Sequence, residues 1–168
     1  MVKYDSAFVM ERIQATVKDL KQKGILNDNI IYVVMMNGGV WFAVHLFDCL
    51  GSVHNPVYFV KAHSYQDAQQ NELVWDYFAL PDIKGKDIVV LDDICDTGNT
   101  SRAILRKLEQ SHPHSVRFVT LLTRTSTDTT GLDLTSCIVD DSKDFFYGCG
   151  LDSHGNHDRF CSFIGICK

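Results

Sequence analysis

One stretch decides the fold: Ile88-Val89-Val90-Leu91-Asp92-Asp93-Ile94-Cys95-Asp96-Thr97-Gly98-Asn99-Thr100-Ser101. Its β-forming residues predict a buried strand over 87–91 that stops at two adjacent carboxylates, and a helical pattern begins at Asn99 and runs over 99–110. Such a unit delivers two acids to a loop of small donors at a helix N-terminus. The acids can bind the hydroxyls of a sugar, and the loop can hold a phosphate attached to that sugar.

The loop residues favour this interpretation over simpler ones. Gly98 lets the backbone approach a ligand closely, and Thr97 and Thr100 supply hydroxyls beside the amides of the helix start. The acid pair could instead be the phosphoacceptor corner of a receiver domain, or solvated acids at the end of a strand. A nucleotide P-loop would need the spacing GxxxxGK[ST], which this stretch does not have.

Strands and helices alternate on both sides of the central unit. An apolar face predicts a first helix from Asp5 or Ser6 to a stop at Gly24, and a second helix over 40–50 is closed by Gly51. Further strands are predicted over 30–36, 56–60 and 116–122, and the polar segment 63–72 is predicted to be a long loop. This order predicts an α/β fold with right-handed crossovers and a mainly parallel, twisted sheet flanked by helices.

The C-terminal part of the chain has a different pattern. From Ser136 onward the periodicity weakens into Asp, Gly and His residues among aromatics. We therefore expect a single domain over 1–168, with a core of about 1–135 and a small hood of about 136–168 that caps the sheet.

Composition narrows the class of protein. The 168 residues are 45% hydrophobic and 22% charged, which is ordinary for a globular domain. The net charge of -5 predicts no nucleic-acid partner, so local groups must hold any anionic ligand. The longest apolar stretch, 30–36, is too short to span a bilayer, and residues 1–6 lack the apolar core of a signal peptide. We expect a cytoplasmic protein without a membrane partner.

Six cysteines could form three disulfides, but their spacing favours another state. None belongs to a CxxC pair, and the chain shows no secretory signal. Reduced and mostly buried thiols are the better prediction.

The segment 89–100 resembles the signature of type I phosphoribosyltransferases, which bind 5-phosphoribosyl-1-pyrophosphate. Other motifs match in order over most of the chain, and the particular likeness is to hypoxanthine-guanine phosphoribosyltransferases. The resemblance implies that Asp92 and Asp93 hold the ribose 2′ and 3′ hydroxyls. It implies that the 5′-phosphate is surrounded by Asp96, Thr97, Gly98, Asn99, Thr100 and Ser101. Asp96 would also face the purine N7, where a carboxylate can accept the proton that the base loses.

Two segments, one after the first predicted strand and one after the second, resemble further parts of this family. Met36-Asn37-Gly38-Gly39 is similar to the pyrophosphate loop, in which a non-proline cis peptide turns amides toward the leaving group. An ordinary Asn-Gly turn is the alternative. Ser64-Tyr65 is similar to the pair on a flap that closes over the reacting centre, although a plain surface loop fits the dipeptide almost as well.

The segment 143–152 resembles the family's purine hood. The resemblance implies that Phe145 stacks on the base, that Phe146 contacts its edge through the backbone, and that Arg159 contacts pyrophosphate. It implies magnesium (Mg²⁺) as the cofactor, with Asp92, Asp93 and Asp152 on the metal side. Zinc held by Asp152, His154, His157 and Asp158 is an alternative, but the spacing matches no known zinc motif.

Three positions depart from the family pattern. Lysines are usual where this chain has Asn37, Asn99 and Thr123, and Arg124 follows the last of these. We expect phosphoribosyl transfer to N9 of a 6-oxopurine in purine salvage, with Thr123 or Arg124 at the base. The alternatives are a regulatory protein that binds the sugar diphosphate without turnover, and an enzyme for adenine or a pyrimidine. The resemblance also implies a homodimer or homotetramer.

Overall fold

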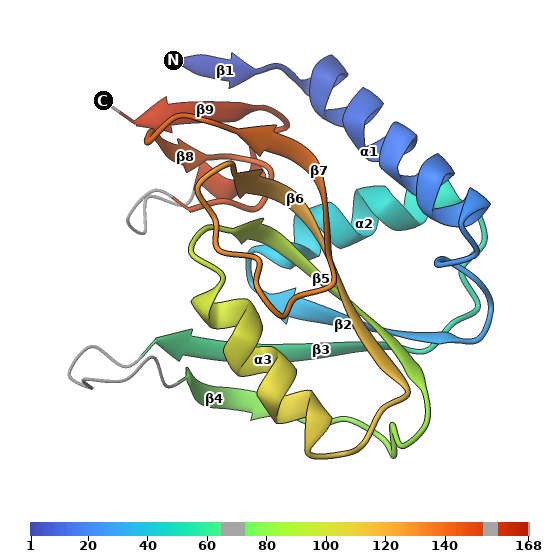
Figure 1. The fold of residues 1–168 in the computed structure, drawn as a ribbon. Coiled ribbons are helices and arrows are strands. Elements are labelled where there is room, and N and C mark those ends of the chain that lie inside the picture. The colour runs from blue at the N-terminus through green and yellow to red at the C-terminus, as the bar shows by residue number, and fades with distance from the viewer. Residues whose placement is uncertain (65–72, 153–157, 168) are drawn as a thin grey trace.

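A computed structural model describes residues 1–64, 73–152 and 158–167 (Figure 1). Six strands form the main sheet in the order β4-β3-β2-β5-β6-β7, in which only the β3–β4 pair is antiparallel. The elements of the chain are β1 (Val2–Tyr4), α1 (Ser6–Gln22), β2 (Ile30–Met36), α2 (Gly39–Leu50), β3 (Val57–Ser64), β4 (Leu73–Phe78), β5 (Asp87–Cys95), α3 (Asn99–Glu109), β6 (Ser115–Arg124), β7 (Leu134–Asp140), β8 (Phe145–Tyr147), η1 (Asp158–Phe160) and β9 (Ile164–Cys167). The predicted α/β class with a mainly parallel sheet is confirmed.

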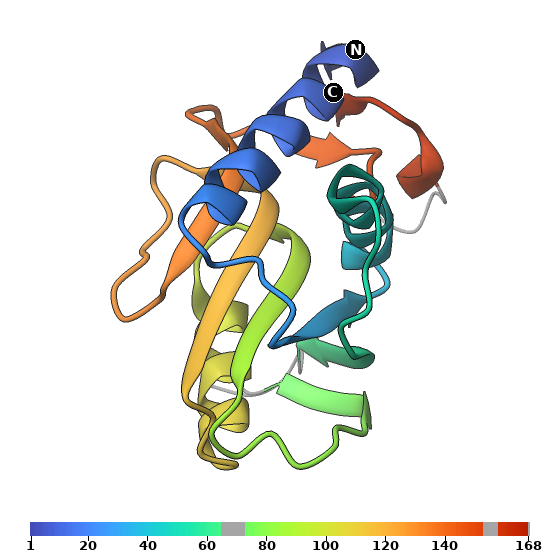
Figure 2. The same ribbon diagram turned by 90° about the vertical axis from the view of Figure 1, so that its right-hand side faces the viewer.

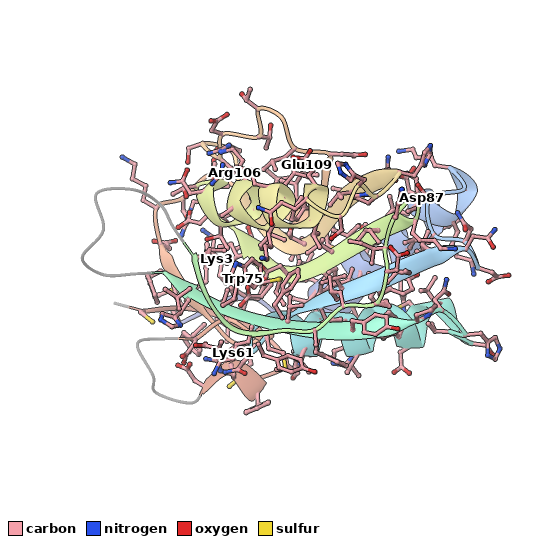
Figure 3. The ribbon with its side chains drawn as sticks, turned by 90° about the horizontal axis from the view of Figure 1, so that it is seen from below. Lys3, Lys61, Trp75, Asp87, Arg106 and Glu109 are labelled. Carbon is pink, nitrogen blue, oxygen red and sulfur yellow. The ribbon has the colours of Figure 1, made fainter. Side chains whose placement is uncertain are left out.

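The central strands are apolar on both faces because helices cover both faces. In β2, Tyr32 and Val34 belong to the core beneath α1 and α2, whereas Ile31 and Val33 belong to the core beneath α3. Figure 2 shows α1 and α2 on one side of the sheet and α3 on the other. Seen from below in Figure 3, Trp75 of β4 lies in the layer between the sheet and α3.

A second, smaller sheet has the order β1-β9-β8. Its first strand comes from the start of the chain and its other two from the end, so both termini lie beside it (Figure 1). The predicted boundary near residue 136 falls inside β7, which pairs in parallel with β6 and belongs to the main sheet. The hood therefore consists of β1, β8, β9 and their connections, and its first strand was missed because three residues carry too little pattern.

The helices and strands that were predicted are confirmed, and their main differences lie at strand ends. Helix α1 begins as expected, with the Asp5 carboxylate accepting a hydrogen bond from the Phe8 amide at 2.8 Å. The prediction that the central strand stops before the acids is wrong, because β5 continues through both of them to Cys95. Pairing with β6 as far as the Cys95–Thr123 register holds this polar extension in the sheet. Five strands were not predicted: β1, β4, β7, β8 and β9.

The topology places a ligand crevice between β2 and β5. The chain leaves β2 toward β3 on one side, and it leaves β5 toward β6 on the other. Ligands of open α/β sheets bind at the carboxyl ends of such diverging strands. Helices α2 and α3 both begin there, at Gly39 and Asn99. Within the described ranges, no helix is both long and apolar enough to cross a membrane.

Candidate active site

A cavity of about 250 Å³ opens at the carboxyl end of β5. It is lined by Asp92, Asp93, Ile94, Cys95, Asp96, Thr97, Gly98, Thr100 and Ser101. The lining includes all the residues that the resemblance assigned to the ribose and the 5′-phosphate except Asn99, whose side chain accepts a hydrogen bond from Arg102. Ile94 and Cys95 were not among the predicted residues. The positive end of the α3 dipole faces this loop, which favours an anion there.

The loop shape depends on Gly98 and on an arginine that follows it. Gly98 has φ of +82°, and a Cβ there would collide with the Asp128 carbonyl. Arg102 donates to the Thr97 carbonyl at 3.2 Å, to Asn99 Oδ1 at 3.0 Å and to the Asp128 carbonyl at 2.9 Å. Arg102 was missed in the sequence, where its place in the first turn after the loop was the available signal.

The start of α2 packs directly against the acid pair. The peptide bond Met36–Asn37 is cis, as the resemblance implied, and the Asn-Gly hairpin turn is excluded because β2 pairs in parallel with both neighbours. A Cβ at Gly38 would overlap the Asp93 carboxylate, and one at Gly39 would lie 2.7 Å from the Leu91 carbonyl oxygen. The close approach of the α2 start to β5 therefore requires two glycines.

The two acids share one desolvated corner. The Asp93 amide donates to Asp92 Oδ1 at 2.9 Å, and the Ile94 amide donates to Asp93 Oδ1 at 2.8 Å. Burial, followed by repulsion from Asp93, raises the pKa of Asp92 well above its usual range, and burial also raises the pKa of Asp93. A bound cation or hydroxyl donors would offset both effects, as expected for a binding site.

The raised pKa makes a prediction for stability. The folded protein retains protons that the unfolded chain releases above about pH 4, so folding weakens as pH rises through the interval up to the raised pKa. The substitution Asp92→Asn should therefore stabilise the ligand-free protein by about 1 kcal/mol at pH 8, and the gain should vanish near pH 4. Urea unfolding between pH 4 and 8 measures it.

A matched control has the opposite sign. Asp87 lies on the same strand, and hydrogen bonds from Ser115 and His114 lower its pKa. Asp87→Asn should destabilise the protein at pH 8, with a loss that fades as the pH falls. A destabilising or pH-independent effect of Asp92→Asn would contradict the account of the acid pair.

Asp96, the predicted catalytic residue, is ion-paired at the cavity. Arg124 Nε donates to Asp96 Oδ1 at 2.6 Å, and the Asp96 side chain is 54% exposed, whereas that of Arg124 is 13% exposed. Of the two residues expected at the base, Thr123 and Arg124, the cation Arg124 is thus the one next to Asp96. Thr123 is buried, and its hydroxyl donates to the Cys95 carbonyl at 2.8 Å, so it supports the loop from below.

Thr127 is another support that the sequence did not reveal. Its hydroxyl donates to the Asp96 carbonyl at 2.6 Å and accepts from the Arg124 amide at 3.2 Å. The turn after β6 therefore holds the backbone on which Asp96 and Arg124 sit.

The aromatic pair of the hood splits into two environments. Phe145 is 45% exposed, whereas Phe146 is 4% exposed and packs in the core. The Arg124 guanidinium carbon lies 4.9 Å from the centre of the Phe146 ring. The Phe145 ring is thus partly exposed at the surface, whereas the buried Phe146 ring anchors the strand.

Asp152 and Arg159 form a pair near the acid corner. Arg159 Nη2 donates to Asp152 Oδ2 at 2.5 Å, and Gly150 between β8 and Asp152 comes so close that a Cβ would overlap the Gly38 carbonyl. Asp152 Oδ1 is buried, and no residue in the described part of the chain forms a hydrogen bond with it. An orphaned carboxylate oxygen suits a hard cation such as Mg²⁺. Among the described residues, no three His, Cys, Asp or Glu side chains surround a common point, so substrate oxygens would have to complete the shell.

The structure gives little information about several of the predicted residues. Ser64 is the last residue of β3, while Tyr65, His154 and His157 lie outside the described residues. All six cysteines are free thiols, of which Cys95, Cys137 and Cys149 are buried.

Comparisons with known proteins agree with this geometry. A family model of the phosphoribosyl transferase domain matches residues 9–154. Hypoxanthine-guanine phosphoribosyltransferase of Mycobacterium bovis is 26% identical over 167 residues, which cover 92% of this chain and 81% of that protein. The bifunctional protein PyrR of Pseudomonas fluorescens is 35% identical over 108 residues, 61% of this chain and 62% of that protein.

A solved structure extends the likeness to the whole fold. The hypoxanthine phosphoribosyltransferase of Staphylococcus aureus matches with a TM-score of 0.84 at 21% identity, covering 100% of this chain and 91% of that chain. The family match includes the acid pair, the cavity loop and the Gly38-Gly39 turn. The chain therefore belongs to the phosphoribosyltransferase family, and its fold is that of the hypoxanthine phosphoribosyltransferases.

Proposed function

We propose that the protein transfers a phosphoribosyl group from 5-phosphoribosyl-1-pyrophosphate to N9 of a 6-oxopurine, and releases pyrophosphate. One observation carries the proposal: the start of α2 packs on Asp93, and the start of α3 lines the cavity that Asp92, Asp93 and Asp96 also line. Two positive helix ends suit a ligand with two anionic groups, and the acids suit the sugar that joins them. The route would serve purine salvage.

The acids also suit the chemistry at the sugar. Breaking the bond between ribose C1 and pyrophosphate builds positive charge on C1 and the ring oxygen. In a desolvated corner, the negative charges of Asp92 and Asp93 stabilise that state while their oxygens accept the ribose hydroxyls. The amides of 97–101 hold the 5′-phosphate, and the amides at Gly38 and Gly39, with Arg159, hold the leaving pyrophosphate.

Asp96 and Arg124 would act on the base. The Asp96 carboxylate accepts the proton from the purine N7 as N9 attacks C1. Each terminal nitrogen of Arg124 carries a second N–H beyond the one it gives to the hood carbonyls, so the guanidinium can donate to an oxo group at C6. Phe145, with its exposed ring, stacks on the purine.

We include Mg²⁺ in the proposal because the site offers suitable oxygen ligands. Asp152 Oδ1, together with Asp92 and Asp93, offers the hard oxygen ligands that Mg²⁺ prefers, and the bound ion would neutralise pyrophosphate charge. A cytoplasmic location, assembly as a homodimer or homotetramer, and closure of a flap carrying Ser64 and Tyr65 rest on the family likeness alone.

A direct assay tests the function. The protein is incubated with Mg²⁺, 5-phosphoribosyl-1-pyrophosphate and each of hypoxanthine, guanine, xanthine, adenine and uracil, and nucleotide formation is followed. We expect turnover with at least one 6-oxopurine and, because Arg124 can only donate, little with adenine. No product with any base would overturn the enzymatic proposal.

Specific observations favour two alternative functions. Asn37 and Asn99 stand where lysines are usual, which favours a regulatory protein that binds the sugar diphosphate without turnover. The similarity over 60 residues to the uracil phosphoribosyltransferase of Rhodococcus jostii favours a different base, and turnover with uracil alone would establish that. Tight binding in calorimetry without product from any base would favour the regulatory protein.

A further inference from the structure

The connection between β7 and β8, residues 141–144, is held by side chains from elsewhere in the chain. It has no regular secondary structure, and it leads directly into Phe145. Arg124 holds its backbone: Nη1 donates to the Ser142 carbonyl at 2.7 Å and Nη2 to the Asp144 carbonyl at 2.7 Å. The third donor of the same guanidinium, Nε, is the one paired with Asp96.

Lys3 holds the side chains of the same connection. Its ammonium donates to Ser142 Oγ at 2.8 Å and to Asp144 Oδ2 at 3.0 Å, and lies 3.0 Å from Asp140 Oδ2. It also lies 5.5 Å from the centre of the Phe146 ring, which thus has two cations near it. Lys3 belongs to β1, which Figure 1 places at the edge of the small sheet, beside β9.

A buried carboxylate fixes Lys3 in this place. Asp140 is 2% exposed, and it accepts hydrogen bonds from Tyr4 Oη at 2.5 Å and from the Ser142 amide at 2.7 Å. Burial opposes ionisation, but the bonds from Ser142, Tyr4 and Lys3 outweigh it and hold the pKa of Asp140 well below its usual range. The carboxylate therefore stays charged at neutral pH and keeps the ammonium of Lys3 beside the connection.

We propose that Lys3 is a positioning residue for base binding. Lys3 and Arg124 together clamp 142–146, one by the side chains and one by the carbonyls, and the clamp sets the place of the Phe145 ring. The first strand of the chain thereby determines how well the base stacks, although none of its residues lines the cavity at the end of β5. This inference rests on the proposed function, because Phe145 is assigned to the base there.

The substitution Lys3→Met tests the proposal. Methionine keeps an unbranched stem of similar length but removes the charge and all three donors. We expect the KM for the base to rise about tenfold, with kcat and the KM for the sugar diphosphate within about twofold of the original protein. Lys3→Arg can still donate to Ser142 Oγ and Asp144 Oδ2, so its KM for the base should return most of the way to that of the original protein.

Lys23→Met is the matched control. Lys23 also pairs with an aspartate, Asp19, at 2.7 Å, but at the exposed C-terminal end of α1. It should leave all three constants unchanged. A Lys3→Met protein with an unchanged KM for the base, or with equal losses for both substrates, would overturn the positioning role.

Hydrogen exchange separates failure of this inference from failure of the proposed function. The amides of 141–147 should exchange about tenfold faster in Lys3→Met than in the original protein, while those of β5 stay as they were. If no base is a substrate, the proposed function fails, and exchange alone decides whether Lys3 holds this segment. Unchanged exchange over 141–147 would overturn the clamp whatever the activity.

Discussion

Replacing Asp96 with asparagine is expected to lower kcat by about 10²–10⁴-fold, the range for loss of a general base. Asparagine has nearly the same shape, and its Oδ1 can still accept the hydrogen bond that Arg124 Nε gives to Asp96. Because charge and basicity disappear while the contact survives, affinity for the sugar diphosphate should change less than about threefold. Steady-state kinetics and calorimetry measure the two effects separately.

The strand that carries Arg124 also offers the control for this substitution. Arg117 Nε donates to Asp133 Oδ2 at 2.8 Å, and the Asp133 side chain is 52% exposed, close to the 54% of Asp96. Asp133→Asn therefore removes the same charge from the same kind of pair, at the amino end of β6 and away from the cavity. It should leave kcat intact. Equal kcat for the Asp96→Asn variant and the original protein would remove Asp96 from the chemistry.

The sequence pattern predicted the central strands of the main sheet because these strands are apolar along most of their length. Segments such as 30–36 are apolar throughout, since helices cover both faces, and their alternation with helical periods leaves few topologies. The phosphate loop was equally readable, because Gly98 and its hydroxyl neighbours are local in the chain. A motif that is contiguous in sequence needs no knowledge of tertiary contacts.

What the sequence could not give are the parts of the site that come together from distant segments. Lys3 and Asp140 lie near opposite ends of the chain, and nothing local marks either as a partner of the other. The end of β5 was placed too early because acids are poor strand formers, and only pairing with β6 keeps them in the sheet. Arginine and threonine are common at protein surfaces, so nothing in the sequence marks Arg102 and Thr127. Their hydrogen bonds to the loop are visible only in the three-dimensional structure.

The substitution Gly38→Ala is expected to weaken binding of the sugar diphosphate with Mg²⁺ by about 10- to 100-fold, the equivalent of about 1–3 kcal/mol for overpacking. The backbone at Gly38 has φ of -62°, which alanine adopts readily, so the added methyl acts through contact alone. That methyl would fall on the carboxylate of Asp93 and force it, or the start of α2, to move. Calorimetric titration measures the loss. Gly24→Ala, where a Cβ meets no atom within 4 Å, should leave the affinity unchanged.

A double-mutant cycle shows whether the methyl acts through Asp93. Asp93→Ala removes the three atoms that the methyl would strike, and by itself it should also weaken binding because a ribose ligand is lost. In that background Gly38→Ala should add little, since the space it needs has been vacated, so the two losses should fall well short of additive. Fully additive losses would mean that the methyl disturbs the pyrophosphate amides directly. The contact between the α2 start and β5 would then matter for the leaving group rather than for the ribose.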